Sequence, residues 1–109
     1  MQTYRKKPVE VQAVQWPLRL KPLKYGDSTG FVSSAWVQAE KILEWLDENH
    51  ADADPFEDAV DGPCLVIRTL EGEMKAKPGD WIIREPFATD DRKFYPCKPD
   101  IFAATYEAV

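Results

Sequence analysis

Residues 78–107 read PGDWIIREPFATDDRKFYPCKPDIFAATYE, and this stretch decides the fold because it alternates turn residues with short apolar runs. Proline, glycine and aspartate at 78–80 are typical of a tight turn. The apolar residues at 81–83 then predict a short buried strand, and Phe94 with Tyr95 predicts another one after a polar loop. The stretch therefore predicts antiparallel strands joined by turns.

The end of this stretch leaves two structures open. Asp100 is a favourable helix N-cap, and Phe102 and Tyr106 have helical spacing. From Ala104 onward the chain also fits a strand that returns to the sheet. The pattern does not decide between a helix and a strand for residues 100–109.

The segments upstream predict more strands. Residues 9–16 alternate apolar and polar side chains, but the alternation slips between Ala13 and Val14, which predicts a β-bulge. Residues 64–77 predict two further strands around a tight turn at Gly72.

One helix is predicted over SSAWVQAEKILEWLDENH, residues 33–50, with Ser33 or Ser34 as N-cap. Trp45 flanks its apolar stripe. The stripe that we expect to be buried consists of Trp36, Ala39, Ile42, Leu43 and Leu46.

Together these elements predict a single α+β domain over residues 1–109. We expect a curled, mostly antiparallel sheet with one main helix packed on it and a short C-terminal helix or strand. Residues 17–34 are interpreted as a variable loop, and residues 47–63, rich in acids and broken by prolines, as an acidic loop.

Composition narrows the class of protein. Hydrophobic residues make up 44% of the chain and the formal net charge is −5, which favours a globular domain and argues against general nucleic-acid binding. No apolar run has the length of a membrane helix, and no apolar signal core follows the basic start, so we expect a cytoplasmic protein. Cys64 and Cys97 are expected to be free thiols there, although a bridge between them stays open.

Several of these segments resemble a family of small uncharacterised proteins of bacteriophages and prophages. The resemblance rests on YRKKPVEVQAVQW, ILEWL, TLEG, PGDWIIR and FYPCKPDIFAATYE, and covers residues 3–16 and 64–109. It implies a phage accessory protein that acts in the cytoplasm of the host cell. The longer EPFATDDRK segment at 85–93 departs from the short glycine-containing hairpin that the resemblance implies.

The sequence offers little for catalysis. Cys97 lacks an obvious base, because the chain has one histidine, His50, and nothing in the sequence brings the two together. No metal-ligand spacing and no phosphate loop is present. We therefore expect no catalytic residue, no metal site, no cofactor and no enzymatic activity.

Basic and aromatic residues on the first and last strands form the candidate ligand site. If those strands are neighbours, guanidinium, ammonium and ring faces would suit a phosphate and a nucleobase. The same rings also fit an ordinary core, and the lysines a protected sheet edge. The candidate ligand-binding residues are Tyr4, Arg5, Lys7, Trp16, Trp81, Arg84, Tyr95 and Lys98.

These residues favour a homo-oligomeric anti-defence protein that sequesters an anionic nucleotide-type immune signal without catalysis. The alternative is an acidic inhibitor that binds a host defence nuclease as a mimic of nucleic acid. It rests on residues 44–61, which carry eight acids and no base.

Overall fold

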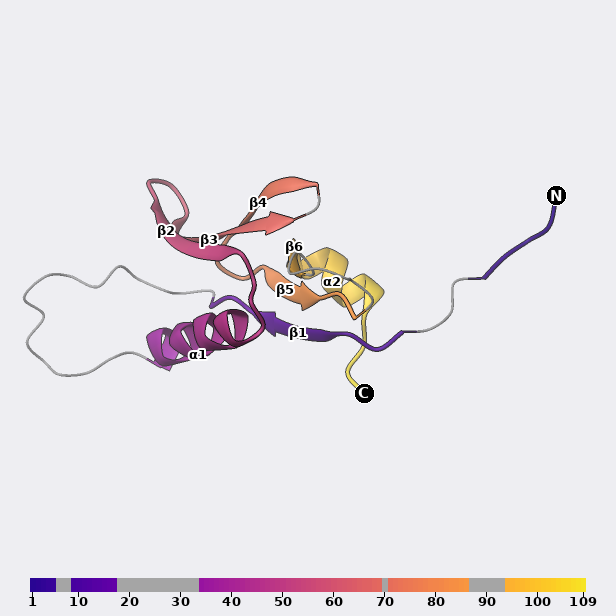
Figure 1. The fold of residues 1–109 in the computed structure, drawn as a ribbon, viewed down its shortest axis with the longest axis horizontal. Helices are drawn as coiled ribbons and strands as arrows, with labels where there is room; N and C mark the ends of the chain where they lie inside the picture. The colour runs from indigo at the N-terminus through magenta and orange to yellow at the C-terminus, as the bar shows by residue number, and fades with distance from the viewer. Residues whose placement is uncertain (6–8, 18–33, 70, 87–93) are drawn as a thin grey trace, which may run out of the picture.

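The structure, a computed structural model, describes residues 1–5, 9–17, 34–69, 71–86 and 94–109, and it confirms the α+β class (Figure 1). The polar loop expected before Phe94 and most of the loop expected at 17–34 lie outside the described residues. The elements are β1 (Gln12–Gln15), α1 (Ser34–Glu48), β2 (Ala53–Asp58), β3 (Gly62–Thr69), β4 (Gly72–Ala76), β5 (Trp81–Arg84), β6 (Phe94–Cys97) and α2 (Pro99–Thr105).

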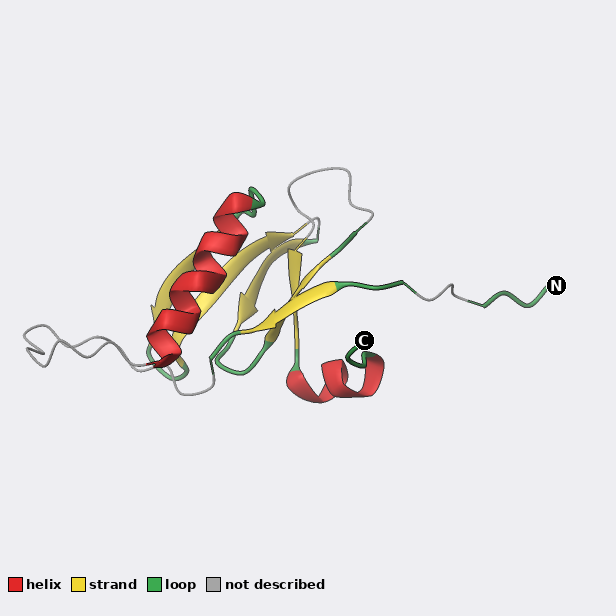
Figure 2. Ribbon diagram, turned by 90° about the horizontal axis from the view of Figure 1, so that it is seen from below, coloured by secondary structure: helices red, strands yellow, loops and turns green. Residues whose placement is uncertain are grey.

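The strands form two antiparallel three-stranded sheets, where the sequence predicted one curled sheet. Their strand orders are β1-β5-β6 and β2-β3-β4, and β3 and β4 contact β6. Figure 2 shows α1 lying across the strands, whereas α2 lies apart from it against the first sheet. The first strand therefore pairs with one of the last ones, β5, as the candidate site required.

Helix α1 buries three of the five residues of the predicted stripe, because Ala39, Ile42 and Leu46 recur on one face and are at most 3% exposed. The other two, Trp36 and Leu43, are partly buried. The three buried residues pack against apolar side chains of both sheets, among them Ile67 and Ile82. The predicted N-cap involves side chains that the structure does not describe.

The helix ends in a Schellman motif. The N–H of Ala51 donates to the carbonyl of Leu46 at 2.9 Å, and the N–H of His50 donates to the carbonyl of Asp47 at 3.0 Å. His50 has a φ of 57°, the left-handed conformation that this position requires. The reversal turns the chain directly into β2.

Trp16 joins the two sheets. It is 1% exposed, and its indole Nε1 donates to the carbonyl of Pro63 on β3 at 2.9 Å. Its backbone N–H donates to the carbonyl of Asp80, and its own carbonyl accepts from Gly79. Its buried polar groups are thus satisfied by both parts of the core.

Two turns are confirmed. In the turn before β5, the N–H of Asp80 donates to the carbonyl of Lys77 at 3.0 Å, and Gly79 has a φ of 93°. Proline and then glycine at the central positions, with positive φ at the glycine, fit a type II turn. Gly72, in the turn between β3 and β4, has a φ of 112°.

The predicted β-bulge in the first strand is wrong. The register of β1 on β5 is continuous, with Ala13 opposite Ile83 and Val14 opposite Ile82. The alternation slips because this strand is covered on both faces. Val14 points toward α1, and the face that carries Ala13 and Ile83 is the one against which α2 packs.

The acidic segment at 47–63 is not a loop, because it contains β2. Its residues pair with β3 in register from Ala53 opposite Ile67 to Asp58 opposite Gly62. Ion pairs to basic residues of β3 and β4 offset the charge that made this segment look unstructured.

The C-terminal element is a helix, which settles the alternative left open by the sequence. The N-cap is Lys98 and not Asp100, and no side-chain hydrogen bond caps this end. Pro99 explains the start of the helix, because its fixed φ suits the first helical position and its missing N–H costs nothing there.

Candidate functional site

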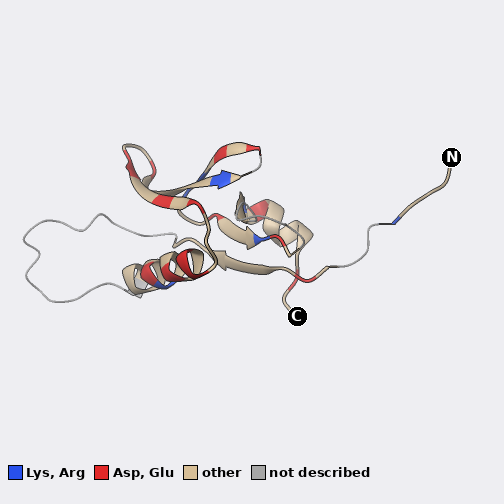
Figure 3. Ribbon diagram, viewed as in Figure 1, with Lys and Arg blue, Asp and Glu red and all other residues tan. Residues whose placement is uncertain are grey.

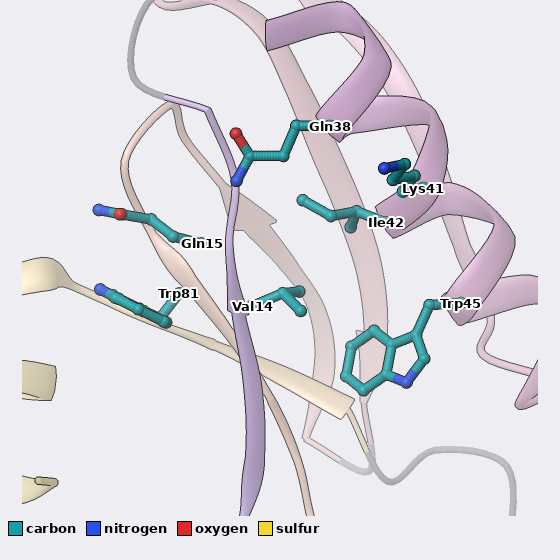
Figure 4. A pocket seen from close by; sticks show the side chains of 7 residues that line it. All are labelled: Val14, Gln15, Gln38, Lys41, Ile42, Trp45 and Trp81. Carbon is teal, nitrogen blue, oxygen red and sulfur yellow. The ribbon is translucent and has the colours of Figure 1, made fainter. Parts of the chain in front are cut away.

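An open groove of about 400 Å³ lies between α1 and β1 (Figure 4). Four lining side chains are apolar or aromatic, two are amides and one is cationic. Such a mixture is typical of a site for a small organic ligand. The lining residues are Val14, Gln15, Gln38, Lys41, Ile42, Trp45 and Trp81.

Helix α1 builds one wall of the groove. Gln38, Lys41 and Trp45 follow one another at helical spacing, so an amide, an ammonium group and an indole ring line the same wall. Trp45 is held by an edge-on contact with Phe94, with ring centroids 5.1 Å apart. Lys41 forms no ion pair among the described residues, so its charge is available to a ligand.

The sheet builds the other wall from both of its faces. Val14 points toward α1, whereas Gln15 and Trp81 point to the other side of β1 (Figure 4). Gln15 is fixed there because its side-chain amide donates to the carbonyl of Gly79 at 3.0 Å.

Trp81 is supported from behind by α2. Its ring stacks on Phe102 with centroids 4.0 Å apart and an interplanar angle of 7°, and Phe102 contacts Tyr106 at 5.0 Å. The hydroxyls of Tyr95 and Tyr106 are 3.3 Å apart. Desolvation and this hydrogen bond raise the pKa of Tyr95 well above its usual range, so the phenol is neutral at physiological pH.

Of the first four candidate residues, the three that the structure describes do not line this groove. Trp16 is buried and its indole N–H is already bonded, so it belongs to the core. Tyr4 and Arg5 lie on an exposed N-terminal segment that runs away from the folded body (Figure 1). Lys7 lies outside the described residues.

The last four candidates are divided between two faces of one sheet. Directly paired residues share a face and successive residues alternate, so Trp81 and Arg84, three apart on β5, lie on opposite faces. Arg84 donates to Gln12 on β1 at 2.9 Å. Tyr95 is on the same face as Trp81, and Lys98 is exposed at the start of α2. Of the seven candidates that the structure describes, only Trp81 lines the groove.

The acidic segment carries two ion-pair clusters on β2, β3 and β4 (Figure 3). In the first, Arg68 bonds Asp52 at 2.9 Å and Asp54 at 3.0 Å, with Glu73 at 3.4 Å. These carboxylates raise the pKa of the guanidinium still further. The single positive charge of Arg68 therefore offsets only part of the negative charge of these three carboxylates.

In the second cluster, Lys75 bonds Asp58 at 2.6 Å and Asp61 at 2.8 Å. Asp58 also accepts from the backbone N–H groups of Val60 and Asp61. The Lys75 ammonium and these N–H groups hold the pKa of Asp58 well below its usual range, and Asp58 in turn raises the pKa of Lys75.

Neither cysteine has the properties of a nucleophile. Both thiols are free, Cys64 is buried, and desolvation raises the pKa of each. In the part of the chain that is described, no group of three potential ligand residues could hold a metal ion, and no helix is long and apolar enough to cross a membrane.

Sequence reasoning missed the α1 wall of the groove, Gln38, Lys41 and Trp45. One signal was present, because Trp45 flanks the buried stripe and a large ring beside a core stripe lies at the edge of the packed face. Lys41 follows the same edge one turn earlier.

Comparisons with known proteins give no family and no relative. No family model matches the chain, and neither a curated protein nor a solved structure is significantly similar to it.

Proposed function

We propose that this chain is a non-catalytic binding protein that holds an anionic nucleotide-type ligand in the groove between α1 and β1. The observation that carries the proposal is the composition of the groove wall on α1, where Lys41, Gln38 and Trp45 lie at helical spacing. An ammonium group binds a phosphate, an amide pairs with the edge of a base, and an indole ring offers a stacking surface.

The same lining argues for binding without chemistry. Among the residues that the structure describes, no histidine, cysteine, aspartate or glutamate lines the groove, so none of them presents a general base or nucleophile to a ligand there. A protein that binds a nucleotide signal and leaves it intact would lower its free concentration. The role against host defence is the part of this proposal that rests on the resemblance to phage accessory proteins.

Thermal unfolding with nucleotides tests the proposal. A mononucleotide such as GMP or a cyclic dinucleotide should raise the melting temperature of the wild type by mass action, and chromatography should recover it intact. Lys41→Met should raise the dissociation constant about tenfold, which corresponds to ~1.4 kcal/mol. Turnover of the ligand, or no shift with any nucleotide, would contradict the proposal.

Two substitutions serve as controls. Lys98→Met removes an exposed ammonium group that does not line the groove, and should leave binding unchanged. Arg84→Ala should also leave it unchanged, because Arg84 bonds Gln12 and does not line the groove. If Arg84→Ala abolishes binding and Lys41→Met does not, the ligand lies at the site predicted from the sequence.

A second function, inhibition of a host nuclease by an acidic surface, is favoured by one observation on α1. Four acids on α1 are spaced so that they form one exposed stripe opposite the buried face. These acids make no ion pair with any described residue. The charge-reversing double substitution Glu44→Lys/Asp47→Lys should abolish such inhibition, and persistence would exclude the stripe. The stripe consists of Glu40, Glu44, Asp47 and Glu48.

A further inference from the structure

Among the described strands, β1 is a free edge of its sheet, because it pairs with β5 alone. Its four residues, Gln12–Gln15, include neither a charge nor a proline that would hinder pairing. Proteins usually protect free edges with charges, prolines or bulges, so an unprotected edge is a surface for another strand.

The other sheet shows the contrast. Its free edge is β2, which contains Pro55 and the acids Asp54, Glu57 and Asp58. The N–H of Arg68 donates to the carbonyl of Asp52, so the backbone groups of residue 52 face β3. This direction alternates along an antiparallel strand, so the backbone groups of residues 55 and 57 point away from β3. Pro55 thus removes a donor from the open side. Within the described residues, the edge at β2 therefore carries such protection and the edge at β1 does not.

The hydrogen-bonding groups on the open side of β1 follow from its pairing. Trp16 directs its N–H and its carbonyl toward the β5 side. In an antiparallel pair this direction alternates along the strand, so the N–H and C=O groups of Ala13 and Gln15 point away from β5. Among the described residues, no strand pairs with these four groups.

We propose that a second copy of this chain pairs with β1 in an antiparallel, two-fold arrangement centred on Val14. The open N–H and C=O groups of Ala13 and Gln15 fix this register, since all four can then bond the partner. In this register Ala13 pairs with the partner's Gln15, and Val14 lies opposite the partner's Val14. The edge is self-complementary, as a two-fold interface must be. The β1 edge is also neutral. An interface in which the acidic α1 stripes of two copies faced each other would be opposed by charge repulsion, since each copy has a net charge of −5.

Such pairing joins the α1 walls of the two grooves into one site. A two-fold axis perpendicular to the sheet keeps both Val14 side chains on the face that carries α1, so both α1 walls lie on that face, whereas Gln15 and Trp81 stay on the opposite one. The joined site contains Lys41 from each copy, and its two cations suit a ligand with two anionic groups. This part rests on the proposed function, because it assumes that the groove binds a nucleotide.

Sedimentation velocity tests the pairing. The wild type should sediment at twice the mass of one chain, and Ala13→Pro should give the mass of one chain. Proline at 13 removes only an N–H on the open side, so pairing with β5 should survive. Glu57→Pro is the matched control on the protected edge and should leave the dimer intact. A monomeric wild type, or a dimer that persists in folded Ala13→Pro, would overturn the proposal.

A measurement without substitutions covers the case in which Ala13→Pro does not fold. Amide hydrogen exchange of the wild type is followed at two protein concentrations, one on each side of the dissociation midpoint. The amides of Ala13 and Gln15 should exchange more slowly at the higher concentration, whereas the open-side amide of Glu57 should not change. Equal exchange of Ala13 and Gln15 at both concentrations would show that β1 is not the interface.

Calorimetric titration with cyclic di-GMP separates the two proposals. One ligand bound per two chains in the wild type supports the joined site. One ligand per chain in a dimer overturns the joined site and leaves the proposed function standing. A dimer that binds neither cyclic di-GMP nor GMP refutes the joined site and the proposed function together, while the pairing through β1 stands.

Discussion

His50 is the described non-glycine residue that adopts a left-handed conformation, and its role is to reverse the chain. Its φ of 57° completes the Schellman motif that ends α1. A side chain with a Cβ atom is strained in this conformation, and glycine is not. The position of the histidine thus reflects backbone geometry, and it lies apart from the residues that line the groove.

His50→Gly should therefore raise the free energy of unfolding by about 1 kcal/mol. Urea denaturation followed by tryptophan fluorescence measures this change. His50→Ala is the control, because alanine keeps the Cβ atom and with it the strain, so it should bring no gain. A loss of stability in His50→Gly would indicate that the imidazole makes a contribution beyond its backbone conformation.

Between elements, the hairpin of β2 and β3 depends on charge. Lys75 on β4 bonds Asp58 and Asp61 at the two ends of the turn, and the turn N–H groups also donate to Asp58. The pKa of Asp58 is lower in the folded state than its ordinary value in the unfolded chain. Ionisation of Asp58 therefore stabilises the folded state at every pH above the ordinary pKa. The stabilisation disappears as the pH falls through the folded pKa.

Asp58→Asn tests this linkage, because asparagine keeps an oxygen for the turn and loses the charge. Between about pH 5 and 7 the melting temperature of the wild type should exceed that of the variant by a constant amount. Below about pH 4 this difference should become smaller. Lys75→Met should reduce this pH dependence by deleting the ion-pair partner, while the turn N–H groups of Val60 and Asp61 still donate to Asp58. A difference that does not change with pH would mean that the ion pair contributes no linkage.

The elements also show which patterns the sequence could predict. α1 and the turns at Gly72 and Gly79 depend on local residues, and these predictions are confirmed. The strand character of β2 depends on pairing with β3 and on ion pairs to Arg68 and Lys75, which are distant in sequence. No local pattern contains that information.

The candidate site also has features that the sequence could predict and features that it could not. Trp81, one of the predicted ligand-binding residues, lines the groove. Alternation along β5 alone places Arg84 on the opposite face, so a closer use of period two would have separated the two residues. For Trp16 the sequence left both a ligand site and the core open, and the local pattern could not decide, because the partner of its indole N–H is the carbonyl of Pro63 in the other sheet.

Across the whole molecule, Trp16 is the side chain that ties the two sheets together. Trp16→Phe removes the indole donor and leaves the buried carbonyl of Pro63 without its partner. We expect the free energy of unfolding to fall by about 2 kcal/mol or more. Trp45→Phe, at a half-buried ring, should cost less than about 1 kcal/mol. Equal losses in the two variants would show that the bond to Pro63 contributes little.

The pairing of β1 with β5 also fixes the order in which a growing chain can fold on the ribosome. The meander of β2, β3 and β4 comes from one continuous stretch and can be complete before β5 has been synthesised. β1 is made first, yet its partner emerges only after that meander, so both of its edges stay unpaired during most of translation. The nascent chain therefore forms the sheet that carries the groove last, and a prematurely terminated chain would expose β1 without forming the groove.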